Sequence, residues 1–191
     1  MKVLALGGSG GMGRFSSFAI SNYPNISKVT IADLNEANAK EFSNHFDDRF
    51  AGIGLDVTDK EHLEKVMSDH DIVLNTTGPF FKFGLPILKS AIKCKCHYFD
   101  ICDDWEPTEE MLKLNDEALK NDVTAIVGLG ASPGISNLLG LKAMNELDET
   151  ESIITGWDMS SAKPEDESSQ KGTNAAMEHG LQQISGEIKV Y

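Results

Sequence analysis

Cysteine and arginine are scarce in this sequence of 191 residues. The three cysteines, Cys94, Cys96 and Cys102, fall within nine residues and make no C-x-x-C pair of the kind that binds zinc. We therefore expect reduced cytoplasmic thiols and no metal site. The two arginines are Arg14 and Arg49, so a substrate carboxylate has few bidentate partners in this chain.

Long apolar runs and an excess of positive charge are also missing. No stretch approaches the roughly 20 apolar residues that span a bilayer. The start, MKVLALGGSGGMG, runs into five glycines after a short apolar stretch, which predicts a first β-strand rather than a signal peptide. A net charge of −13, from 30 acidic and 17 basic residues, disfavours nucleic acid and anionic membranes as partners.

Short apolar runs alternate with segments of helical spacing through the first part of the chain. We expect strands at residues 3–6, 28–32, 51–57, 72–75, 97–101 and 124–128. We expect helices at 14–21, 35–46, 60–67 (capped by Thr58 or Asp59), 85–94, 108–120 and 137–145. This alternation predicts βαβ units, and so an α/β fold with a doubly wound parallel sheet of the Rossmann type.

The composition changes near residue 150. We expect a strand at 152–157, a polar loop at 160–172, a helix at 174–184 and a strand at 187–191. This region is too small to bury a core of its own. We therefore expect a dinucleotide-binding domain at 1–150 and, at 151–191, the beginning of a substrate or dimerisation domain in a fragment of a longer protein.

Residues 8–13, GSGGMG, match the dinucleotide-binding pattern G-x-G-x-x-G between a predicted strand and a predicted helix. In this pattern Gly8 makes the tight turn, Gly10 lets the pyrophosphate approach the backbone, and Gly13 lets helix and strand pack closely. A glycine-rich turn without a ligand is the alternative. The predicted cofactor-binding residues here are Gly8, Ser9, Gly10, Gly11, Met12 and Gly13.

Three residues after the second and third strands are candidates for the adenosine half of the cofactor. Asp33, at the end of the second strand, is expected to accept hydrogen bonds from the ribose hydroxyls. Its carboxylate repels a 2′-phosphate and no arginine follows it, so NAD is favoured, with NADP still possible. Asp56 and Val57 are expected near the adenine, although Asp56 could equally cap the next helix.

The loop after the fourth strand, NTTGPFF, should lie at the edge where open α/β sheets bind ligands. We expect its threonines and Gly-Pro turn to line the nicotinamide ribose: Thr76, Thr77, Gly78 and Pro79. Phe80, with Phe81, is expected to contact substrate and shield the nicotinamide from water. The alternative is that Gly-Pro is only a turn.

The loops after the fifth and sixth strands carry the predicted catalytic and substrate residues. Cys102 and Asp103 are placed at the reacting centre, as acid, base or ammonium-binding groups, and Asp104 beside a cationic substrate. A helix-capping role for this cluster is equally open. Ser132 and Pro133, with Pro133 at a helix start, predict a second loop of backbone donors.

Four motifs in this order and spacing resemble the saccharopine dehydrogenase family: GGSGGMGR, NTTGPFFKFG, HYFDICDDW and GLGASPGISNLL. The resemblance covers roughly residues 2–145. It implies NAD(P)-dependent oxidation, or reductive formation, of a C–N bond in an amino acid, with members that include saccharopine dehydrogenases, lysine 6-dehydrogenases and carboxynorspermidine synthases. It also implies an amino-acid substrate, a homodimer and a chain about twice as long.

Two alternatives stand beside this expectation. A bare Rossmann domain can bind NAD(H) as a regulatory module without turnover, and a carboxynorspermidine synthase-type reductase would share the same motifs. A short-chain reductase or epimerase is disfavoured, because no tyrosine is followed by a lysine four residues later.

Overall fold

The computed structural model describes residues 1–156, and they are built around one parallel sheet. Its strands are β1 (Lys2–Leu6), β2 (Lys28–Asp33), β3 (Phe50–Gly54), β4 (Ile72–Asn75), β5 (His97–Asp100) and β6 (Ala125–Ile126). Their order is β3-β2-β1-β4-β5-β6, and every neighbouring pair is parallel. This is the Rossmann order, which confirms the predicted fold class.

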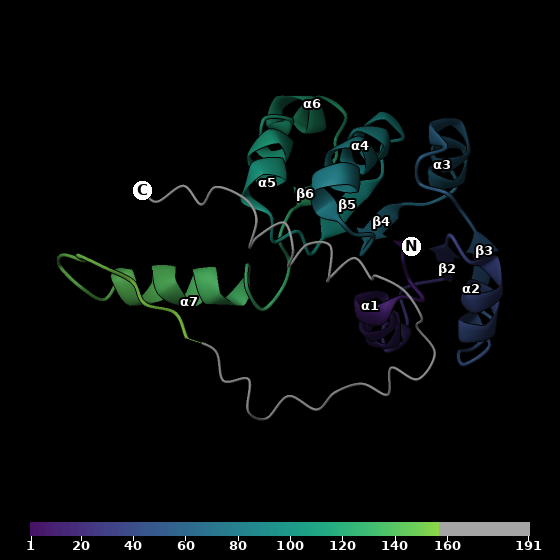
Figure 1. Cartoon of the computed structure of the whole chain (residues 1–191), viewed down its shortest axis with the longest axis horizontal. Coiled ribbons are helices and arrows are strands. Elements are labelled where there is room, and N and C mark those ends of the chain that lie inside the picture. The colour runs from purple at the N-terminus through teal and green to yellow at the C-terminus, as the bar shows by residue number, and fades with distance from the viewer. Residues whose placement is uncertain (157–191) are drawn as a thin grey trace.

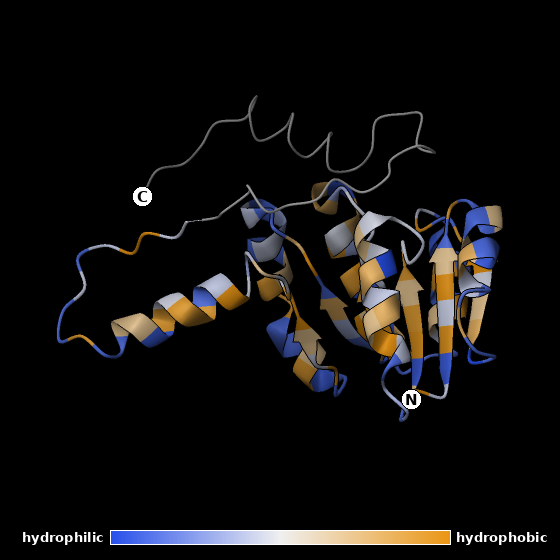
Figure 2. Cartoon of the chain, turned by 90° about the horizontal axis from the view of Figure 1, so that it is seen from below, coloured by the Kyte–Doolittle hydropathy of each residue, from blue (hydrophilic) through white to orange (hydrophobic). Residues whose placement is uncertain are grey.

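Helices cover both faces of the sheet (Figure 1). One face carries α1 (Gly11–Ser21) and α2 (Glu36–Ser43). The other carries α3 (Lys60–Met67), α4 (Phe80–Lys93), α5 (Trp105–Leu112) and α6 (Asn115–Lys120). A further helix, α7 (Ile135–Met144), projects away from the sheet in both Figure 1 and Figure 2.

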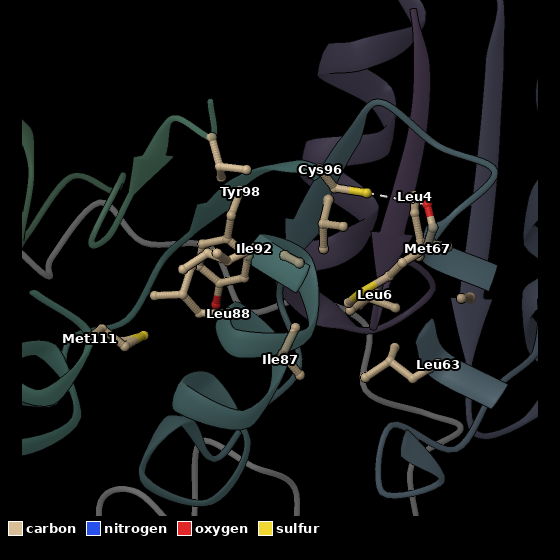
Figure 3. Packing of buried hydrophobic residues seen from close by; sticks show 14 of the residues in the cluster. Leu4, Leu6, Leu63, Met67, Ile87, Leu88, Ile92, Cys96, Tyr98 and Met111 are labelled. Atoms are coloured by element: carbon tan, nitrogen blue, oxygen red, sulfur yellow. Dashed lines mark hydrogen bonds between the residues drawn. The ribbon is translucent and has the colours of Figure 1, made fainter. Parts of the chain in front are cut away.

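Alternation along the strands sends side chains to two separate cores. In β1, Val3 joins the core under α1 and α2, whereas Leu4 and Leu6 join the larger core under α3 to α6. Figure 3 shows the larger core, with side chains of α3, α4 and α5 against Leu4, Leu6 and Tyr98. Full burial of each such side chain is worth about 1.5–3 kcal/mol.

The predicted elements are recovered with shifted ends. The helix at Lys60–Met67 and the strand at Ile72–Asn75 have the predicted bounds. Asp59 is the N-cap of α3, and its side chain accepts a hydrogen bond from the backbone N–H of His62. The first helix begins inside the glycine motif, at Gly11, and β6 keeps only two residues of the predicted strand.

The larger differences concern α4, α5 and α6. The helix expected at 85–94 begins earlier, at Phe80, and continues through Pro86 to Lys93. Pro107 lies in the first turn of α5, where its missing N–H has no intrahelical partner to lose, so that helix begins at Trp105. The single helix expected at 108–120 is two helices that break at Lys113 and Leu114.

The expected strand at 152–157 is wrong for its described part, because residues 152–156 form no helix or strand. The loop, helix and strand expected at 160–191 lie outside the described residues. Before this point none of the residues of α7 is buried, although many are apolar, as the orange bands on the projecting helix in Figure 2 indicate. No helix in residues 1–156 has the length and apolar character needed to cross a bilayer.

Candidate functional site

The loops after β1 and β4 lie side by side at the carboxyl edge of the sheet, between its two halves, β3-β2-β1 and β4-β5-β6. Gly7 has φ +67°, in the left-handed region that favours glycine. Its N–H bonds the carbonyl of Ala32 at 2.9 Å. A Cβ on Gly7 would lie 3.1 Å from the carbonyl carbon of Thr76. The sequence analysis did not identify Gly7 as a turn residue. The pair of glycines after the first strand, Gly7 and Gly8, could have indicated it.

The glycine motif packs the start of α1 tightly against β1. A Cβ on Gly13 would lie 2.1 Å from the carbonyl oxygen of Gly7, so no other residue fits without a shift of backbone. A Cβ on Gly8 would lie 2.9 Å from the carbonyl oxygen of Ala5. The close helix–strand packing predicted for Gly13 is therefore present in the structure.

On its outer side the same loop is open. A Cβ on Gly10 would approach only the Gly7 carbonyl, at 3.2 Å, and one on Gly11 would meet nothing within 4 Å. Gly11, Met12 and Gly13 form the first turn of α1, where backbone N–H groups have no partner inside the helix. An open backbone, N–H groups without a partner inside the helix and the positive end of a helix dipole together fit a pyrophosphate.

Ser9 and Asp33 are brought together beside this loop. The Ser9 hydroxyl donates to Oδ2 of Asp33 at 2.6 Å, and the N–H of Asn35 donates to Oδ1 at 3.3 Å. Asp33 ends β2 and stays half-exposed. The structure thus places the predicted ribose-binding carboxylate next to the predicted phosphate loop.

A cation also lies at this loop, and sequence reasoning did not identify it as a site residue. The Arg14 Nε donates to the Ser9 carbonyl at 2.8 Å, and its guanidinium lies 5.2 Å from the centre of the Phe42 ring. Its signal was its place directly after Gly13. Arg49 has other partners, because its guanidinium donates to the backbone carbonyls of residues 21, 23 and 26, at and after the end of α1.

Asp56 and Val57 have structural roles in the folded chain. Oδ1 of Asp56 accepts hydrogen bonds from the N–H and hydroxyl of Thr58, at 2.8 and 2.6 Å, and these bonds lower the pKa of Asp56. Val57 packs against the larger core. Asp56 closes the turn ahead of α3, but the N-cap of that helix is Asp59, so the capping role considered for Asp56 is wrong. Contact of Asp56 with the adenine stays a prediction.

The two threonines after β4 differ in what their hydroxyls contact. The Thr76 hydroxyl donates towards the carbonyls of Leu6 and Gly7, at 2.9 and 3.2 Å, and ties this loop to the end of β1. The Thr77 hydroxyl is buried and has no hydrogen-bond partner within the described residues. Buried polar atoms are usually satisfied, so an orphaned hydroxyl at a strand end is suited to a ligand. Thr77, Gly10 and Gly11 therefore fit a dinucleotide.

Phe80 and Phe81, the aromatic pair that follows this loop, differ in burial. Pro79 is the N-cap of α4, after half-exposed Gly78, and Phe80 begins the helix. Phe80 is buried in the larger core, whereas the ring of Phe81 is exposed. Phe80 and Phe81 therefore do not form the expected aromatic wall together, because consecutive side chains of a helix face different sides.

The three candidate residues after β5, Cys102, Asp103 and Asp104, also differ in burial. Cys102 is fully buried, and burial raises the pKa of its thiol to about 11, so it remains protonated near neutral pH. This argues against the predicted acid–base role of Cys102. Asp104 is half-buried at the N-cap position of α5, and Asp103 is exposed between them. Asp103 alone of the two predicted catalytic residues lies at the surface of this edge.

The loop after β6 is compact rather than open. Its N–H groups are used internally: that of Gly128 bonds the Asp100 carboxylate, that of Leu129 the Asp100 carbonyl, and that of Gly130 the Pro133 carbonyl. α7 begins at Ile135, two residues after Pro133, and exposed Ser132 lies before it. The predicted placement of Pro133 at the first position of the helix is therefore wrong, and three N–H groups of this loop already have partners within the protein.

Two cavities among the described residues lie away from this edge. One, of about 490 Å³, is lined by apolar side chains of α4, α5, α6 and β6. Another, of about 460 Å³, lies between β2, β3 and α3. Neither includes a residue of the glycine loop or of the loop after β4. Within residues 1–156 no three His, Cys, Asp or Glu side chains are grouped to hold a metal.

Comparison with known proteins agrees with this geometry. The model of the saccharopine dehydrogenase NADP-binding domain matches residues 3–126, well over half of the chain. Saccharopine dehydrogenase (NADP+, L-glutamate-forming) of Saccharomyces cerevisiae is 30% identical over 119 residues, which cover 62% of this chain and 25% of that protein. The Schizosaccharomyces pombe enzyme is 29% identical with the same coverage. The chain thus spans about a quarter of the length of these relatives.

Solved structures give the same result. The apo saccharopine dehydrogenase of Saccharomyces cerevisiae superposes with a TM-score of 0.65 and 29% identity, over 76% of this chain and 31% of that one. A myo-inositol dehydrogenase of Sinorhizobium meliloti, at 18% identity, 76% and 41% coverage, and a TM-score of 0.54, shares the fold. The chain belongs to the saccharopine dehydrogenase NADP-binding domain family, as an NAD(P)-binding Rossmann domain.

Proposed function

We propose that the chain is the cofactor-binding part of an NAD(P)-dependent oxidoreductase that acts on the C–N bond of an amino acid such as saccharopine or lysine. The observation that carries the proposal is the edge of the sheet where the open glycines, the Ser9–Asp33 pair and the Thr77 hydroxyl lie on adjacent strand ends. A bound nicotinamide would supply the hydride acceptor or donor. The chain itself binds, orients and shields that group.

NAD is the first candidate for the cofactor. Ser9 fixes Oδ2 of Asp33, so the carboxylate is held in place before a ribose arrives. Two ribose hydroxyls can donate to a carboxylate, whereas a 2′-phosphate brings two like charges together. We therefore expect tighter binding of NADH than of NADPH.

NADP is the second candidate, and Arg14 is the observation that favours it. Its guanidinium is tied to the backbone of Ser9, and the Ser9 side chain contacts Asp33. A planar guanidinium is the preferred protein partner of a phosphate group. The relatives named above carry NADP in their names. Arg14→Ala should weaken NADPH binding and leave NADH binding unchanged if the phosphate is held there.

Asp103 is our candidate acid, base or ammonium-binding group. It is exposed directly after β5, at the carboxyl edge of the sheet. The neighbouring Cys102 is enclosed and protonated, and Asp104 lies at the helix N-cap. Asp103 is therefore left as the acidic side chain of this loop that solvent and substrate can reach.

We further propose that residues 1–150 form the cofactor domain and that 151–191 begin a substrate domain in a cytoplasmic homodimer. Support comes from α7, whose apolar residues Leu138 and Leu139 are 68% and 62% exposed. A helix of this kind normally packs against another element. A second domain would also supply the substrate-carboxylate partner that the two arginines of this chain do not provide.

The test is turnover by the longest protein product that contains this chain, with saccharopine and lysine as trial substrates and NAD+ and NADP+ as cofactors. The appearance of reduced nicotinamide with either amino acid supports the proposal. Cofactor binding without turnover of saccharopine, lysine or related imines would instead identify a non-catalytic NAD(H)-binding module.

A further inference from the structure

A fully buried carboxylate lies beneath the loops that end β5 and β6. Oδ1 of Asp100 accepts hydrogen bonds from the N–H groups of Cys102, at 3.0 Å, and Gly128, at 2.9 Å. Oδ2 accepts the hydroxyl of Tyr98 at 2.8 Å. One side chain of zero exposure thus fixes the start of both loops.

The hydrogen bonds continue through the sheet to the loop after β4. The hydroxyl of Tyr98 accepts a hydrogen bond from Nδ2 of Asn75 at 3.0 Å, and Oδ1 of Asn75 accepts one from the N–H of Thr77 at 3.0 Å. Asn75 and Tyr98 are also fully buried, and Figure 3 shows the Tyr98 ring among Leu88 and Ile92 of α4. We call Asn75, Tyr98 and Asp100 the strand-end relay.

The relay is costly for the fold. The partners of the Asp100 carboxylate given above are two backbone amides and a phenol, none of which is a cation. Burial raises the pKa of Asp100, and the three hydrogen bonds oppose that rise. Burial of a carboxylate away from a cation carries a desolvation cost that its hydrogen bonds must offset, and an apolar side chain of the same size would carry none.

Thr77 is where the relay reaches the binding edge. Its N–H is held by Asn75, and its hydroxyl is a buried group that has no partner within residues 1–156. On the other side the relay holds Cys102, which precedes Asp103. The two loops proposed for the nicotinamide half are therefore connected through buried hydrogen bonds, which resist small displacements in a low-dielectric interior.

We propose that Asp100, acting through Tyr98 and Asn75, is a positioning residue that fixes Thr77 against the nicotinamide half of a bound dinucleotide. The inference deepens the proposed function and rests on it for the identity of the ligand. It predicts that the relay affects the nicotinamide half of the ligand and has no effect on the adenosine half, which binds at β1 and β2.

The test compares NADH and NADPH with ADP-ribose, which lacks the nicotinamide, by calorimetric titration of the purified chain. Tyr98→Phe removes the central hydroxyl and keeps the ring. We expect it to raise the Kd of the better dinucleotide about 5- to 10-fold and the Kd of ADP-ribose less than about 2-fold. Thr30→Val is the matched control, because it removes another buried hydroxyl bond, of 2.8 Å between Thr30 in β2 and His70 after α3, away from these loops.

Thr77→Val extends the test if Tyr98→Phe fails to fold. This variant replaces an orphaned hydroxyl by a methyl group, so it should keep or raise the melting temperature while raising the Kd of the dinucleotide as Tyr98→Phe does. A Thr77→Val protein with unchanged selectivity for dinucleotide over ADP-ribose would overturn the proposal. A Tyr98→Phe protein that is less stable but binds the dinucleotide and ADP-ribose as wild type does would also overturn it. This is the result expected for the Thr30→Val control.

The readout does not depend on turnover. A protein that binds NADH but oxidises no amino acid would contradict the proposed function and still test the relay. A wild-type protein that binds ADP-ribose as tightly as NADH and NADPH would contradict the relay, because there would be no nicotinamide contact for it to position.

Discussion

The hydroxyl of Ser9 donates a hydrogen bond of 2.6 Å to the carboxylate of Asp33. The bond joins the phosphate loop after β1 to the end of β2 and fixes the carboxylate that is proposed to hold the adenosine ribose. The preference for NAD or NADP should therefore depend on both side chains, and mutation of each in turn can separate their contributions.

Replacement of Asp33 by alanine tests the ribose contact. Loss of charge-assisted hydrogen bonds should weaken NADH binding by about 1.5–2 kcal/mol, whereas NADPH, relieved of a like charge, should bind as well or better. Titration by nicotinamide fluorescence measures both. Ser9→Ala leaves the carboxylate in place, held by the longer bond from the Asn35 N–H, so its loss of NADH affinity should be smaller. An equal fall for both cofactors in Asp33→Ala would contradict the assignment.

The two sides of the glycine loop should respond differently to an added methyl group. Gly13→Ala forces a Cβ into the Gly7 carbonyl and should destabilise the fold by roughly 1–3 kcal/mol, as overpacking does. Gly11→Ala meets nothing within 4 Å and is its matched control, with stability unchanged or slightly raised. Urea denaturation followed by circular dichroism gives both free energies of unfolding. Equal losses in the two variants would show that the packing is looser than described.

Asp103→Asn tests the proposed chemistry in the longest product that contains the chain. As an acid or base, Asp103 should contribute a factor of ~10²–10⁴ to turnover, while the melting temperature and NADH affinity of the variant stay close to wild type. If Asp103 serves only the N-terminus of α5, the variant should lose thermal stability and keep its turnover. Steady-state kinetics and a melting curve on one preparation separate the two roles.

His70 should make stability depend on pH. Its Nδ1 lies 2.8 Å from the Val66 carbonyl, to which it donates, and in the neutral ring Nε2 accepts the Thr30 hydroxyl at 2.8 Å. Burial lowers the pKa of His70 below its ordinary value of 6.5. The unfolded chain therefore takes up a proton first, so this contribution to stability is present above pH 6.5 and is lost as the pH falls below it.

Melting temperatures between pH 7.5 and about 5 check this dependence. His70→Gln should flatten the curve, whereas His62→Gln, on the exposed side of α3, should leave its slope as in wild type. If the melting temperature of His70→Gln depends on pH as steeply as that of wild type, the proton uptake belongs to another group.

The fold could be predicted from the sequence because its signals are local. The run that forms β1, the glycine motif and the spacing to Asp33 each follow from neighbouring residues. What the sequence did not reveal depends on distant contacts: the Ser9 bond to Asp33, Arg14 on the Ser9 backbone, and the burial of Cys102. Periodicity also misplaced the start of α4, because a helix tolerated Pro86 once its apolar face was packed.

The most direct test of the central claim is binding of NADH to Gly10→Val protein. Gly10 has φ −75°, which valine adopts, and its Cβ would approach only the Gly7 carbonyl at 3.2 Å, so the fold should persist by circular dichroism. The side chain would occupy the volume where a pyrophosphate meets the backbone. The account predicts tight NADH or NADPH binding by wild type and none detectable by folded Gly10→Val. A folded Gly10→Val protein that binds either dinucleotide with wild-type affinity would contradict it.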